Sequence, residues 1–99
     1  MGQASLRQVQ ALVHAHHGEH AKAETLAREA VARIERTDGL NYQGDALCDL
    51  AEVLHAAGRR DEAAAALGQA LERYERKKNL AMAAQVRERL GELQDAAPR

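Results

Sequence analysis

The stretch LCDLAEVLHAAGRRDEAAAALGQALERY, residues 47–74, decides the fold. Asp61 and Glu62 place negative charge just after Gly58, where the first turn of a helix favours it. Gly58 itself is suited to end a helix in the left-handed conformation. On both sides of Gly58 apolar residues recur at steps of three and four, as they do along one face of an α-helix: Leu47, Leu50, Leu54 and Ala57 before it, and Ala63, Leu67, Ala70, Leu71 and Tyr74 after it. The stretch therefore predicts an antiparallel helical hairpin.

The pattern repeats outward from this hairpin at an offset of 40 residues, the separation of Gly18 and Gly58. Ala23 and Ala63 correspond at this offset, and the joints around residues 38–40 and 78–80 are predicted to match. We expect helices over residues 3–17, 20–36, 40–57 and 60–77, and a fifth beginning after Asn79, which suits a helix N-cap. The chain is then a single domain, residues 1–99, with a hairpin over 3–38, a hairpin over 39–77 and a capping helix over 79–95.

Composition supports an all-α domain and excludes several classes of protein. The 99 residues include one Pro, no Trp and no Phe, and alanine and leucine are abundant. A formal net charge of −1 argues against a nucleic-acid partner, and one Cys excludes an internal disulfide framework. No segment approaches the roughly 20 apolar residues of a membrane span. We expect a cytoplasmic protein with no membrane or nucleic-acid partner and no cofactor.

The hairpin resembles a tetratricopeptide repeat. That family places large, small and apolar residues at fixed offsets around a turn glycine, and the matching residues here are Leu47, Leu50, Ala51, Leu54, Gly58, Ala63, Leu67 and Ala70. Glu75 replaces the family's closing proline, and the offset of 40 residues exceeds the usual period of roughly 34. The resemblance implies an antiparallel α–α hairpin solenoid of five helices that binds proteins and is not an enzyme.

Longer phrases carry a second resemblance. The segments AKAETLAREAVARIERTDGLNYQGDALCDLAEVLHAAGR, residues 21–59, and RRDEAAAALGQALERYERKKNLAMAAQVRERLGEL, residues 59–93, are similar to the last repeats of large actinobacterial signalling regulators. Those proteins join a cyclase or transcription-factor domain to an ATPase module and a helical repeat array. The chain contains no GxxxxGK[ST] phosphate-binding motif, so the resemblance implies only the repeat module and a partner protein or neighbouring domain.

The resemblance also implies a concave face made by the first helix of each hairpin and by the last helix. Its residues would be Ser5, Gln8 and Leu12 in the first hairpin, and then Asp45, Cys48, Glu52, His55, Gln85, Glu88 and Glu92. The later set is acidic, which favours a basic partner segment. The Lys, Arg and Asn residues with which the family clamps a peptide carboxylate are absent from these positions. A plain solvated face is the competing interpretation.

The first predicted helix departs from the repeat pattern. Its bulky residues lie on another side of the helix than the repeat positions do: Leu6, Val9, Leu12 and Val13. That side would cover either a preceding repeat of a longer parent chain or a second copy of this chain. Self-association as a homodimer is therefore an alternative function.

Two further clusters carry possible chemistry. The segment HAHHGEH contains four histidines at spacings that can bind zinc, nickel or copper, which makes a metal-responsive module a second alternative: His14, His16, His17 and His20. Because Gly18 interrupts the helix, polar residues at a solvated turn are the simpler explanation. Cys48 and His55 lie two helical turns apart, which makes a hydrolase a distant third interpretation.

Overall fold

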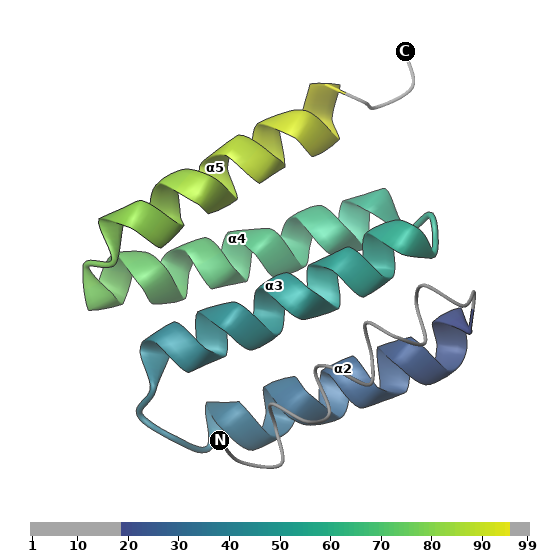
Figure 1. Ribbon diagram of the computed structural model, residues 1–99, viewed down its shortest axis with the longest axis horizontal. Coiled ribbons are helices and arrows are strands. Elements are labelled where there is room, and N and C mark those ends of the chain that lie inside the picture. Colours follow the sequence, from purple (N-terminus) through teal and green to yellow (C-terminus); the bar gives the residue numbers. More distant parts are fainter. Residues whose placement is uncertain (1–18, 96–99) are drawn as a thin grey trace.

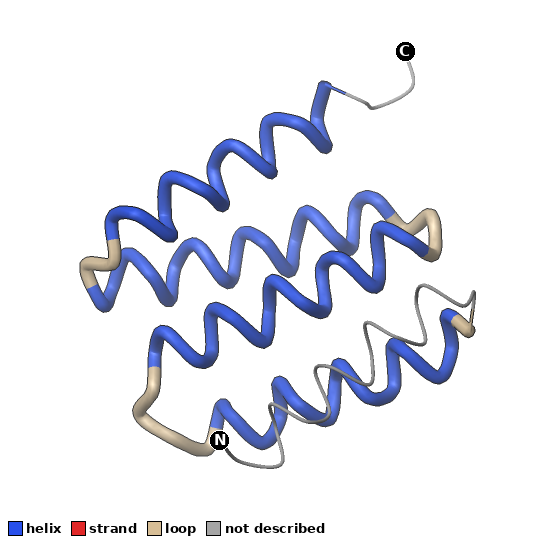
Figure 2. The backbone as a smooth tube through the Cα atoms, in the orientation of Figure 1, coloured by secondary structure: helices blue, strands red, loops and turns tan. Residues whose placement is uncertain are grey.

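The computed structural model describes residues 19–95, in which four α-helices follow one another (Figure 1): α2 His20–Glu35, α3 Leu40–Ala56, α4 Arg60–Lys77 and α5 Leu80–Asp95. Figure 2 shows helices joined by short turns, and no strand occurs in the described range. These helices confirm the second to fifth predicted ones to within a residue or so. The first predicted helix and Gly18 lie outside the described residues.

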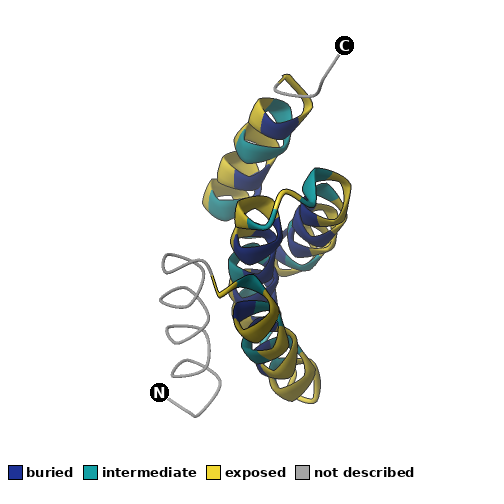
Figure 3. Cartoon of the chain, turned by 90° about the vertical axis from the view of Figure 1, so that its right-hand side faces the viewer, coloured by how far each residue is buried: buried dark blue, intermediate teal, exposed yellow. Residues whose placement is uncertain are grey.

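Successive helices pack side by side in antiparallel order. The α3–α4 pair forms the most extensive contact, and α2 packs against α3 while α5 packs against α4. Seen from the side, α3 and α5 lie on one side of the array and α4 on the other (Figure 3). This alternation is the arrangement expected of stacked helical hairpins. No helix in residues 19–95 has the length and apolar character needed to cross a membrane.

Alanines are prominent on the buried faces of the helices. Five of them are at most 1% exposed: Ala23, Ala30, Ala51, Ala63 and Ala70. Larger side chains interdigitate beside them, as close helix packing requires: Leu47, Leu54, Leu67 and Tyr74 are at most 2% exposed. Most core positions inferred from the 3.6-residue periodicity are therefore confirmed, whereas Ala57 and Leu71 are only half-buried.

Two turns form as their sequences predict. Gly58 has a φ of +78°, and the next residue, Arg59, donates its backbone N–H to the carbonyl of Leu54, which closes the end of α3. Asn79 caps α5, because its side-chain Oδ1 accepts the backbone N–H of Met82 at 3.2 Å. These short connections fix the order and antiparallel direction of the helices.

The predicted match between the two joints is wrong in detail. α4 continues to Lys77 and ends with Lys78 in the left-handed conformation, whereas α2 ends at Glu35. Thr37 stops α2 early, because its hydroxyl donates to the carbonyl of Ile34 at 2.7 Å and its own carbonyl accepts the Gln43 amide at 2.8 Å. Lys77, the residue equivalent to Thr37 at the 40-residue offset, has no hydroxyl to make such a bond.

Candidate functional site

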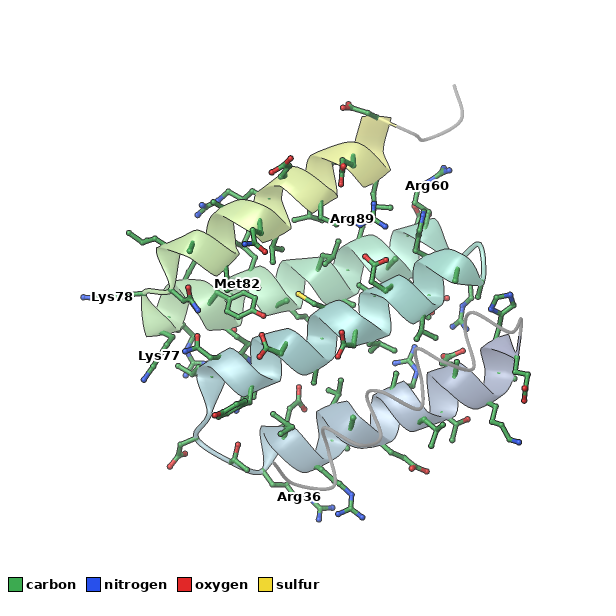
Figure 4. All side chains as sticks on the ribbon, viewed as in Figure 1. Arg36, Arg60, Lys77, Lys78, Met82 and Arg89 are labelled. Atoms are coloured by element: carbon green, nitrogen blue, oxygen red, sulfur yellow. The ribbon has the colours of Figure 1, made fainter. Side chains whose placement is uncertain are left out.

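A cavity of about 190 Å³ lies between α3 and α5, and Leu67 of α4 also lines it. The remaining lining residues come from α3 and α5: Cys48, Asp49 and Glu52 from α3, and Met82, Gln85, Val86 and Arg89 from α5. Figure 4 shows Met82 and Arg89 on the side of α5 that faces α3 and α4. We refer to this space as the α3–α5 cavity.

One ion pair spans the α3–α5 cavity. Arg89 donates from Nε to Glu52 Oε1 at 2.9 Å and from Nη2 to Glu52 Oε2 at 3.3 Å, the forked geometry that suits a carboxylate. These hydrogen bonds are the main reason why the pKa of Arg89 is raised. Arg89 Nη1 also lies 3.5 Å from Glu92 Oε1. The guanidinium therefore connects α3 with the next turn of its own helix.

Beside the cavity, the buried ring of Tyr74 supports two residues of α3. Its hydroxyl donates to Asp45 Oδ1 at 2.5 Å and lies 3.9 Å from Cys48 Sγ. Burial, followed by the hydrogen bond to Asp45, raises the pKa of Tyr74, which stays a neutral donor at any ordinary pH. The aromatic side chain of α4 thereby contacts two predicted concave residues, Asp45 and Cys48.

The surroundings of Cys48 favour the neutral thiol over the thiolate. Burial raises the pKa of its thiol to about 11, with a smaller contribution from the nearby carboxylates of Asp49, Asp45 and Glu52 and an opposing one from the Tyr74 hydrogen bond. Catalytic cysteines show the reverse shift, since a thiolate is the reactive form. The raised pKa of the thiol does not support the hydrolase interpretation of Cys48 and His55.

The predicted concave residues separate into two groups. Cys48, Glu52 and Gln85 meet at the α3–α5 cavity. Outside its lining lie the exposed residues Asp45, His55, Glu88 and Glu92, of which Glu92 reaches the cavity only through Arg89. The candidate site is therefore narrower than the predicted face.

Sequence reasoning missed five residues of the lining: Asp49, Leu67, Met82, Val86 and Arg89. A signal was present for three of them, because Met82, Val86 and Arg89 recur at helical spacing on one face of the last helix. Asp49 and Arg89 are also equivalent at the 40-residue offset and opposite in charge. Only a structure shows that Arg89 reaches Glu52, which is 37 residues away in the chain.

The two alternative sites fall mostly outside the described residues. Leu6, Val9, Leu12 and Val13 lie there, and so do Ser5, Gln8 and three of the four clustered histidines: His14, His16 and His17. His20 is described and is the first residue of α2. Among residues 19–95, no three His, Cys, Asp or Glu side chains are placed to hold a metal ion.

Two larger hollows are lined by groups that already bind one another. One of about 660 Å³ lies where the α2–α3 joint meets α4, and there Arg73 donates to Gln43 at 2.9 Å and lies 3.5 Å from Glu35. The other, of about 360 Å³, lies between α2 and α4 above leucines of α3. At its edge Arg28 Nη2 lies 3.7 Å from Glu62 Oε2. In both hollows these side-chain contacts connect neighbouring helices.

Comparison with known proteins agrees with the arrangement of the helices. The profile of the tetratricopeptide repeat family matches residues 3–76, which is most of the chain. Searches of curated proteins and of solved structures find no match. Members of this family are repeat modules that typically mediate protein–protein interaction and are not catalytic. On the strength of this match and of the stacked helical hairpins, the chain belongs to the tetratricopeptide repeat family.

Proposed function

We propose that the chain is a protein-binding module whose concave face, formed by α3 and α5, holds a segment of a partner protein. The α3–α5 cavity is the observation that carries this proposal, because Cys48 and Glu52 of α3 meet Gln85 of α5 there. The acidic residues around it favour a basic partner segment: Asp45, Asp49, Glu52, Glu88 and Glu92. The proposed module has five helices, the first over residues 3–17.

We assign α5 the role of a capping helix in this module. At the 40-residue offset, Arg87 and Gln94 of α5 are equivalent to Leu47 and Leu54 of α3. The two leucines are 2% exposed and pack in the core, whereas Arg87 and Gln94 are exposed. Polar residues in place of the leucines give α5 an outer face that favours water over another helix. This supports the division into hairpins 3–38 and 39–77 and a cap over 79–95.

The resemblance of residues 21–93 to actinobacterial signalling regulators suggests the kind of protein in which the module works. We infer that it works in the cytoplasm as part of a signalling or transcriptional regulator, where it binds another protein or a neighbouring domain. Three of its cations, Arg36, Arg60 and Lys78, extend from different sides of the molecule rather than forming one basic surface (Figure 4). A protein partner fits this charge distribution better than a nucleic acid.

Site-specific cross-linking tests the proposed function. A photoreactive amino acid would replace Gln85 or Glu88 on the concave face, and Glu29 or Gln69 on α2 and α4 as matched exposed controls. We expect a cross-linked protein, captured from an extract of the native host, at the concave positions and not at the controls. Equal capture at all four positions, or capture at the controls alone, would reject a concave binding face.

A further inference from the structure

We propose that the α3–α5 cavity receives one apolar side chain of a partner peptide, and that an arginine or lysine beside it takes the place of Arg89 on Glu52. This inference rests on the proposed function and specifies the peptide that the concave face recognises. Two features support it: the apolar floor of the cavity and the unequal balance of charge around its mouth.

The floor of the cavity suits an apolar side chain. Leu67, Met82 and Val86 line it together with the Cys48 thiol, which burial keeps neutral. The volume of about 190 Å³ compares with ~30 Å³ for one water in the liquid. It therefore has room for a single leucine- or methionine-sized side chain and not for a helix. Water that solvates these apolar groups would be released when the side chain enters, which favours binding.

The mouth of the cavity suits a cation. Among the described residues that line it, Asp49 and Glu52 are acidic and Arg89 alone is basic. The neighbouring exposed positions of α3 and α5 add Asp45, Glu88 and Glu92. The summed charge of this region is negative, so that a cationic peptide is attracted to it and an anionic peptide is repelled.

Exchange at Glu52 makes room for that cation at little cost. The side chains of Arg89 and Glu52 are 30% and 47% exposed, and ion pairs with such exposure are weak. When a peptide cation replaces Arg89, Glu52 keeps a partner. Arg89 keeps one too, because Glu92 Oε1 already lies 3.5 Å from its Nη1. The exchange leaves no charge unpaired and also opens the cavity that the guanidinium spans.

The test uses dye-labelled peptides and the whole chain of 99 residues, with binding measured by fluorescence anisotropy. Three peptides share a glycine–serine frame and differ in a central triplet: Arg-Leu-Arg, Arg-Ala-Arg or Glu-Leu-Glu. We expect the Arg-Leu-Arg peptide to bind about tenfold more tightly than the Arg-Ala-Arg peptide, because alanine is too small to fill the cavity that leucine would occupy. We expect a similar difference in affinity between the Arg-Leu-Arg and Glu-Leu-Glu peptides, because the glutamates of the latter are repelled by the acidic residues at the mouth of the cavity.

Variants of residues around the cavity separate this inference from a general charge effect. Gln85→Trp covers the cavity mouth, and Glu52→Gln removes the receiving carboxylate; each should weaken the Arg-Leu-Arg peptide about tenfold. Arg89→Gln removes the competing internal cation and should tighten the same peptide. Glu75→Gln is the matched control, because Glu75 pairs with Arg87 outside the cavity, and it should leave binding unchanged.

Equal affinity for the three peptides, or no measurable binding of any of them, would overturn the inference. Weaker binding by Arg89→Gln would overturn the exchange step, because it would make Arg89 a ligand contact. Circular dichroism of each variant would show whether it keeps its helices. Cross-linking at Gln85 tests the proposed function independently, so a concave face that captures a protein but not these peptides would refute only this inference.

Discussion

The ring of Tyr74 lies directly against the backbone of Gly44: a Cβ atom at that glycine would stand 2.6 Å from both Cε1 and Cζ of the ring. Tyr74 is fully buried, so the ring has no open space into which to turn. The contact lets α3 approach α4 closely and brings the hydroxyl to Asp45 and Cys48. One glycine in the N-terminal part of α3 thus helps to position part of the concave face.

We expect Gly44→Ala to destabilise the protein. The added methyl group overlaps the Tyr74 ring, and such overpacking costs about 1–3 kcal/mol, against which alanine regains up to ~1 kcal/mol of helix propensity. Urea denaturation measures the difference. Gly68→Ala is the matched control, since nothing lies within 4 Å of a Cβ at that position of α4, and it should stabilise by about 0.5–1 kcal/mol. A gain for both variants would contradict the close contact.

Leucine at the alanine crossings should also destabilise the protein. Ala63 and Ala70 are 0% exposed, so that Ala63→Leu or Ala70→Leu forces neighbouring helices apart at a cost of about 1–3 kcal/mol. Ala65→Leu, at an exposed position of the same helix, is the control and should change stability by no more than ~0.5 kcal/mol. Thermal melts followed by circular dichroism compare the three. Identical melting temperatures would show that the helices do not pack at these alanines.

Local sequence signals predict the helices well because each depends on neighbouring residues. The turn glycine Gly58, the cap Asn79 and the buried alanines follow from rules that span a few residues, and Tyr74 is placed in the core by its spacing. These rules do not predict the contact of Tyr74 with Gly44, because a glycine inside a helix otherwise indicates only a weaker helix. They also assume equal joints, whereas Thr37 ends α2 early by hydrogen bonds of its own side chain and carbonyl.

The candidate site is harder to predict, because it depends on residues far apart in the chain. Glu52 and Gln85 follow from the repeat register. Arg89 does not, since its long side chain leans across to α3 and the register alone gives only the position of its Cα atom. The interpretations of residues 3–17 as a helix and as an apolar interface stay predictions.

Cys48 should react slowly with alkylating reagents in the native protein. With a thiol pKa of about 11, the thiolate is scarce at about pH 8, and we expect iodoacetamide to react about a hundredfold more slowly than with free cysteine. The rate should rise with pH up to about 11. Unfolding in urea should restore the ordinary rate. A rate that levels off below pH 9 would show that the thiol is not buried as described.

The same raised pKa predicts a loss of stability in alkali. The unfolded chain releases the Cys48 proton near its ordinary pKa of 9.0, whereas the native state holds it to about 11. Between these values the native state binds more protons, so its stability falls as the pH rises. Cys48→Ala should reduce the slope of the free energy of unfolding against pH over this window. An unchanged slope would mean that the native and unfolded thiols titrate alike.

Four charged side chains form a closed ring that joins α2 to the start of α4: Glu24, Arg28, Arg59 and Glu62. Hydrogen bonds from Arg59, and then from Arg28, lower the pKa of Glu24 below its ordinary 4.5. Because the pKa of Glu24 is lower in the folded protein, the ring stabilises the fold at pH values above the ordinary 4.5, and this stabilisation is lost as the pH falls through the lowered pKa.

We expect Glu24→Gln to lower the free energy of unfolding by about 1 kcal/mol at neutral pH. The difference from the wild type should shrink at about pH 3 and in ~1 M salt, which screens the ring. Glu88→Gln, at an exposed position of α5, should differ little from the wild type; an equal loss for both variants, or a Glu24→Gln effect that persists in acid, would assign the stabilisation to something other than the ring.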